Sequence, residues 1–81
     1  MQRPSTSNRA AASTVRELSE RETEVLKLSS HGLTNKEIAA RIGVGVKSIE
    51  TFKARGLVKL EIQTRADLMR YASRSGWLAD V

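Results

Sequence analysis

The chain has 81 residues, which is enough for one small domain, and it contains no cysteine. It therefore has neither a disulfide nor a thiolate zinc site, and its composition is compatible with a reduced compartment. Its 14 lysines and arginines exceed its 9 aspartates and glutamates, which gives a formal net charge of +5. A basic balance favours a polyanionic partner, although many basic proteins bind none.

Several classes of protein and site are disfavoured by what the sequence lacks. It has no run of about 20 apolar residues to span a membrane and no apolar segment of a secretory signal near its start. We therefore expect a cytoplasmic protein with no membrane partner. The single His31 has no second histidine or cysteine to share a metal, so we expect neither a metal nor a cofactor.

Residues 1–17 hold the only proline, are rich in Ser, Thr, Ala and Arg, and show no apolar period. We interpret them as a flexible linker or tail before a domain at residues 18–81. A linker would lead to a sensory or receiver domain, whereas a tail would open a small complete regulator. Arg3, Arg9 and Arg16 either contact phosphate or a minor groove, or simply keep the tail soluble.

The first helix is expected over about residues 19–30. Ser19 and Glu22 have the spacing of a capping box, in which each side chain bonds the other residue's backbone amide. His31 falls in the last turn, where a hydrogen-bond donor is favourable. Apolar residues for the core are Leu18, Val25, Leu26 and Leu28.

The second helix follows a second capping box, formed by Thr34 and Glu37. Leu33 and Ile38 are spaced as a hydrophobic staple, and Gly43 is a natural left-handed residue to end the helix. A new helix begins within about three residues. Two helices joined by so tight a turn are typical of a helix-turn-helix, whose second helix enters the major groove of DNA.

The third helix, residues 46–60, divides into two faces when it is wound at about 100° per residue. The apolar face comprises Ile49, Phe52, Gly56, Leu57 and Leu60. The opposite face comprises Lys47, Glu50, Thr51, Ala54, Arg55 and Val58. An ordinary solvated helix would show two such faces, but the preceding turn favours a surface that enters a groove.

Two glycines of this segment are unusual. Gly45 is an acceptable N-cap but has no side-chain acceptor. Gly56 costs about 1 kcal/mol in a helix interior relative to alanine. Its place on the apolar face favours close approach by another helix over a kink.

A fourth helix is expected over about residues 65–73, after a cap at Thr64 with Asp67 at its third position. Leu68 and Ala72 face the core. Gly76 ends the element, and the Trp77 that follows either folds back onto the domain or is buried in a partner. The fold class is therefore all-α, with four helices.

The run from Leu18 to about Ala72 resembles the LuxR-type (GerE-like) helix-turn-helix domain of bacterial response regulators and quorum-sensing regulators. Matching residues in the first half are Leu18, Ser19, Arg21, Glu22, Val25, Leu26, Gly32, Leu33, Asn35, Lys36, Glu37, Ile38 and Ala39. Those in the second half are Ile42, Gly43, Val44, Lys47, Ser48, Ile49, Thr51, Lys59, Leu60, Thr64, Arg65, Ala66, Leu68, Tyr71 and Ala72. The resemblance implies sequence-specific binding of double-stranded DNA as the effector domain of a transcription regulator.

Four residues depart from the family pattern. Gly45 stands where Ser is usual, Phe52 replaces a common His, Gly56 replaces a large aliphatic residue, and Glu61 replaces Gly. Phe52 cannot repeat a polar contact, so we expect it to pack against sugar or core.

Candidate site residues follow from the faces of the helices and from the resemblance. The predicted base-reading residues are Lys47, Glu50, Thr51, Ala54 and Arg55. The predicted phosphate contacts are Asn35, Lys36, Lys53 and Lys59. By resemblance, the fourth helix mediates dimerisation on DNA through Met69, Arg70 and Ser73. RNA polymerase is a further expected partner.

No enzyme is predicted. Gly43 and Gly45 do not form a nucleotide loop, because no third glycine follows at position 48 and no strand precedes them. One alternative is a sigma-factor region-4-like promoter-binding domain. Another is a helical protein-interaction bundle without DNA binding, which the cationic face of the third helix argues against.

Overall fold

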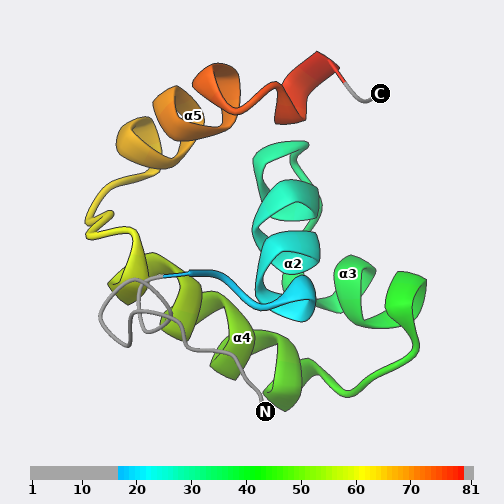
Figure 1. Ribbon diagram of the computed structural model, residues 1–81. Coiled ribbons are helices and arrows are strands. Elements are labelled where there is room, and N and C mark those ends of the chain that lie inside the picture. Colours follow the sequence, from blue (N-terminus) through cyan, green and yellow to red (C-terminus); the bar gives the residue numbers. More distant parts are fainter. Residues whose placement is uncertain (1–16, 80–81) are drawn as a thin grey trace, which may run out of the picture.

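The computed structural model describes residues 17–79, which form four α-helices and a short 3-10 helix (Figure 1). In chain order the elements are α2 (Glu20–Ser30), α3 (Asn35–Ile42), α4 (Val46–Lys59), α5 (Arg65–Arg74) and η1 (Trp77–Ala79). No strand occurs between residues 17 and 79, so the predicted all-α class is confirmed. The predicted linker lies, apart from Glu17, outside the described residues.

Local hydrogen bonds fix where three of the helices begin. The Ser19 hydroxyl accepts from the Glu22 amide at 3.1 Å, and the Glu22 carboxylate accepts from the Ser19 amide at 2.9 Å. Thr34 and Glu37 repeat this capping box at 3.1 and 2.8 Å. Thr64 caps α5 by accepting from the Asp67 amide at 3.1 Å. Both predicted capping boxes and this cap are therefore present.

The core lies where α4 packs against α2 and α3. Its fully buried members are Val25 from α2, Ile38 from α3 and Ile49 from α4, with Ala39 beside them. Partly buried residues that pack around them are Leu28, Leu33, Ile42, Val44 and Phe52. Burying each large aliphatic side chain contributes about 1.5–3 kcal/mol, so the inner face of α4 is firmly held. Phe52 therefore packs against the core, which is one of the two places expected for it.

Gly56 allows α4 and α2 to approach closely. A Cβ atom at this position would lie 2.7 Å from Cδ1 and 3.2 Å from Cγ of the fully buried Leu26. Helix α4 continues through Gly56 to Lys59. Close packing, rather than a kink, is therefore the reason for this glycine.

The turns on either side of α4 differ in how they reverse the chain. Gly43 has φ +77° in the left-handed region, and the Ala39 carbonyl accepts from its amide at 2.9 Å. Gly45 is the N-cap of α4 and makes no side-chain cap bond, as predicted. After α4, Glu61 has φ +57°, the one positive φ at a non-glycine residue between positions 17 and 79. Glycine, which the resemblance implies at this position, would adopt such a φ without strain.

The C-terminal segment folds back onto the domain. Helix α5 packs against α2 and η1, burying Leu68 and Ala72 as predicted. The Trp77 ring meets the Tyr71 ring edge to face, with centroids 5.1 Å apart. The carbonyl oxygen of Trp77 lies 2.7 Å from Nε2 of His31, the C-cap of α2. Because a carbonyl only accepts, Nε2 carries the hydrogen, and His31 serves to anchor η1.

Candidate nucleic-acid interface

Helices α3 and α4 are joined by residues 43–45 and form the two arms of a helix-turn-helix. In Figure 1, α4 lies along the lower part of the molecule, with α2 above it. Its inner face is buried at Ile49 and Gly56. The predicted base-reading residues Lys47, Glu50, Thr51, Ala54 and Arg55 are all exposed. The helical period of the sequence therefore predicted correctly which face of α4 is buried and which is exposed. Contact of the outer face with bases stays a prediction.

Thr51 has a restricted choice of contacts. Its hydroxyl donates to the Lys47 carbonyl oxygen at 3.2 Å, one helical turn earlier. The hydroxyl hydrogen is therefore used within α4, and the side chain offers an acceptor oxygen and a methyl group to a ligand.

The first turn of α3 holds two of the predicted phosphate contacts. Lys36 is exposed, and Asn35 is half-buried. The Oδ1 atom of Asn35 is buried without a hydrogen-bond partner, and the NH2 group is the part of this side chain that could donate to an anion. The amides of Thr34 and Glu37 already serve the capping box, so a phosphate at this helix end would meet those of Asn35 and Lys36.

Lys53 lies on the flank of α4 and is half-buried. It lines a hollow between α4 and the start of α5, together with Arg65 and polar groups of the intervening loop. The other lining residues are Ser29, Leu57, Ile62, Gln63, Thr64 and Leu68. Its position beside the outer face is consistent with the predicted phosphate contact.

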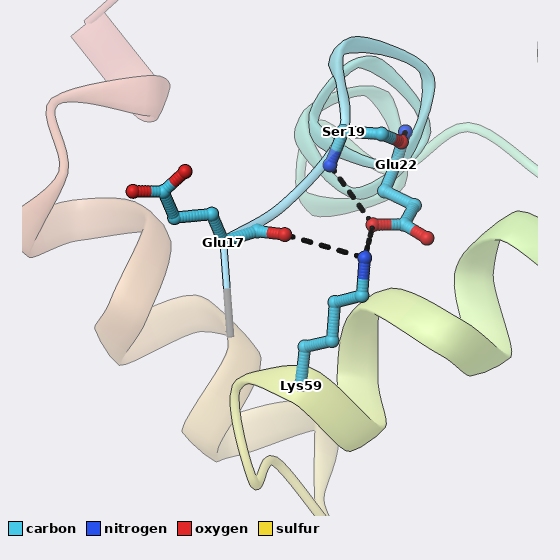
Figure 2. Close-up of polar contacts among 4 residues, drawn as sticks. All are labelled: Glu17, Ser19, Glu22 and Lys59. Atoms are coloured by element: carbon cyan, nitrogen blue, oxygen red, sulfur yellow. Dashed lines mark hydrogen bonds and ion pairs between the residues drawn. The ribbon is translucent and has the colours of Figure 1, made fainter. Parts of the chain in front are cut away.

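Lys59 is held inside the domain by two partners (Figure 2). Its Nζ atom lies 2.7 Å from the Glu22 carboxylate and donates to the Glu17 carbonyl oxygen at 3.2 Å. The Glu22 side chain is 5% exposed and that of Lys59 is 27% exposed. One of the three ammonium hydrogens remains for a phosphate. Lys59 is thus a bridge between α2 and α4, a role that the sequence analysis did not predict.

The charge on Glu22 is maintained by this bridge. Burial acts to raise the pKa of Glu22, but the hydrogen bond and positive charge of Lys59 act against it, together with hydrogen bonds from Ser19. The net result is a pKa below the ordinary value for glutamate. Glu22 therefore stays ionised at neutral pH while it completes both the cap of α2 and the ion pair.

The predicted dimerisation residues lie on α5. Arg70 and Ser73 are exposed, and Met69 is half-buried. The Arg70 guanidinium pairs with Asp67 one turn earlier on the same helix. Met69 is therefore the apolar residue of this surface, and pairing of two copies through it stays a prediction.

A short helix, a tight glycine turn and a second helix with a buried inner face and a largely polar, cation-bearing outer face define a helix-turn-helix domain of the DNA-binding class. The family model described as bacterial regulatory proteins, luxR family (GerE), matches residues 16–72. The chain belongs to this family. The family is one of DNA-binding regulators rather than enzymes, and membership decides against the sigma-factor alternative.

Relatives of known name match the same region. The oxygen regulatory protein NreC of Staphylococcus haemolyticus (strain JCSC1435) is 40% identical over 55 residues, which are 68% of this chain and 25% of that protein. The protein of the same name in Staphylococcus aureus (strain JH9) is 42% identical over 55 residues, which are again 68% of this chain and 25% of that protein. The matched segment thus spans about a quarter of these relatives.

None of the helices in residues 17–79 is both long enough and apolar enough to span a membrane.

Proposed function

We propose that this domain binds double-stranded DNA sequence-specifically, with α4 in the major groove, as the effector domain of a bacterial transcription regulator. The observation that carries the proposal is the division of α4 into a buried inner face and an exposed outer face bearing Lys47, Glu50, Thr51 and Arg55. Such a helix presents hydrogen-bonding groups to base edges while the rest of the domain holds it rigid.

Phosphate contacts surround this helix in the proposal. Asn35 and Lys36 would bind a phosphate at the start of α3, and Lys53 would bind one beside α4. Since Lys59 is engaged by Glu22 and Glu17, we assign it a minor share of the phosphate binding.

We further propose that two copies bind together on DNA, because one recognition helix reads about half a dozen base pairs or fewer. Met69, Arg70 and Ser73 of α5 would form the contact between the copies. A regulator of this kind acts in the cytoplasm, with RNA polymerase as the partner that its binding influences.

The test begins with selection of bound sequences from random duplex DNA, followed by titrations at several salt concentrations. The two cations assigned to phosphate without an internal partner in residues 17–79, Lys36 and Lys53, predict a slope of log affinity against log salt of about −1.8 per subunit. Replacing Lys36 by alanine should make this slope shallower by about 0.9. The matched control is Arg74→Ala on α5, which should leave the slope unchanged. Affinity that does not vary with salt, or selection that recovers no preferred sequence, would refute the proposal.

A further inference from the structure

The outer face of α4 carries an exposed apolar residue that the polar contacts do not explain. Val58 is 77% exposed, and between positions 17 and 79 the other exposed large apolar residue is Val46, at 40%. Val58 lines a shallow hollow with Ala54, Arg55 and Lys59. An exposed valine of this kind offers methyl groups to whatever covers it.

Val58 is aligned with the residues expected to read bases. At about 100° per residue, Lys47, Thr51, Ala54 and Val58 fall within about 60° of one another, so they form one stripe along α4. The stripe extends about 16 Å at 1.5 Å per residue, which is close to five base-pair steps. Val46 lies about 100° away from Lys47 and is off the stripe.

After Lys47, the side chains of the stripe present mainly methyl groups. Ala54 has only a methyl group, Val58 has two, and Thr51 has its hydroxyl hydrogen bonded to the Lys47 carbonyl oxygen. Hydrogen-bond donors lie at its start in Lys47 and on one flank in Arg55. In the major groove, the feature of a base that methyl groups recognise is the C5-methyl of thymine.

We infer that Thr51, Ala54 and Val58 read thymine methyl groups and that Val58 is a specificity-determining residue. The inference rests on the proposed function and specifies the half-site: a base with acceptors opposite Lys47, followed by thymines along the stripe. DNA fits this surface better than a protein does. The apolar patch of Val58 and Ala54 is bordered by exposed Arg55 and is far smaller than the roughly 800 Å² that each partner contributes to a stable protein interface.

The experiment replaces each thymine of the selected half-site, one at a time, by deoxyuridine, which removes only the methyl group. We expect affinity to fall about fourfold at each thymine that the stripe contacts, from the burial of one methyl group. For Val58→Ala the loss at one position should fall below about twofold, while losses at the other positions persist. Val46→Ala is the matched control and should keep every loss.

Each outcome decides the inference. If deoxyuridine weakens binding at no position, the stripe does not read methyl groups. If Val58→Ala retains all the losses, Val58 does not contact a thymine methyl group and is not a specificity-determining residue. Salt-dependent binding that persists in either case leaves the proposed function standing, whereas absence of any binding refutes the proposed function itself. Thermal unfolding of Val58→Ala should match or slightly exceed that of the parent, because the side chain is exposed and alanine is the better helix former.

Discussion

The ion pair between Glu22 and Lys59 should stabilise the domain to a measurable degree. In Lys59→Met the apolar stem is kept, but the Glu22 carboxylate, 5% exposed, loses its cation. A buried charged group left without a partner costs about 1–3 kcal/mol or more. Because Lys59 is 27% exposed and Glu22 keeps the hydrogen bond from the Ser19 amide, we expect a loss of about 2 kcal/mol. For a domain of this size that lowers Tm by about 8–16 °C.

The pH dependence provides a second test of the same pair. The pKa of Glu22 is lower in the folded state than its ordinary value, so its contribution is fully present above the unfolded pKa of about 4.3. The contribution is lost as pH falls through the folded pKa. The difference in free energy of unfolding between the parent and Glu22→Gln should therefore be large near neutral pH and small in acid.

Urea unfolding followed by circular dichroism from about pH 7 to pH 3 measures both effects for the parent, the two single variants and the double variant. The two changes should be non-additive by about 0.5–3 kcal/mol, because the residues are in contact. The matched control is Arg21→Met, which removes an exposed pair with Glu24 and should cost under about 1 kcal/mol. A Lys59→Met cost as small as the control, or a difference that does not change with pH, would refute this account of the bridge.

Three further predictions concern packing, backbone and pairing. Gly56→Ala gains about 1 kcal/mol of helix propensity but forces Leu26 to move, so chemical denaturation should show a net loss of up to about 2 kcal/mol; a full gain of 1 kcal/mol would mean that α2 and α4 are loosely packed. Glu61→Gly should be about 1 kcal/mol more stable than Glu61→Ala, because both lose the side chain and only alanine keeps a Cβ at φ +57°; equal stabilities in the same assay would contradict this. Met69→Glu should abolish cooperative binding to paired half-sites and leave binding to a single half-site intact; cooperativity equal to that of the parent would exclude α5 as the contact.

Local rules made much of the fold predictable. Ser19, Thr34 and Thr64 start helices through bonds that span three residues, and Gly43 ends one through its own backbone conformation. Each of these features is complete within one short stretch of sequence. The close approach at Gly56 was also predictable, because the helical period places this glycine on the apolar face of the helix.

Features that join distant segments were not predictable in the same way. Glu22 and Lys59 are 37 positions apart, and each had a sufficient local explanation, one as a cap and the other as a cation. The pair emerges only once α2 and α4 are packed together. The exposure of Val58 follows from the period, but its significance depends on Thr51, whose hydroxyl is bonded within the helix. Side-chain hydrogen bonds of this kind are not encoded in spacing.

The attachment of η1 gives this protein a built-in optical probe. Trp77 is the single tryptophan of the chain, and its ring rests against Tyr71 of α5 while its backbone is bonded to His31 of α2. Its fluorescence therefore reports on the C-terminal quarter of the domain, whereas circular dichroism averages over all the helices. Since Trp77 lies outside the helix-turn-helix of α3 and α4 and packs against α5, a change in its emission on adding DNA would report on pairing of two copies at α5 rather than on contact of α4 with bases.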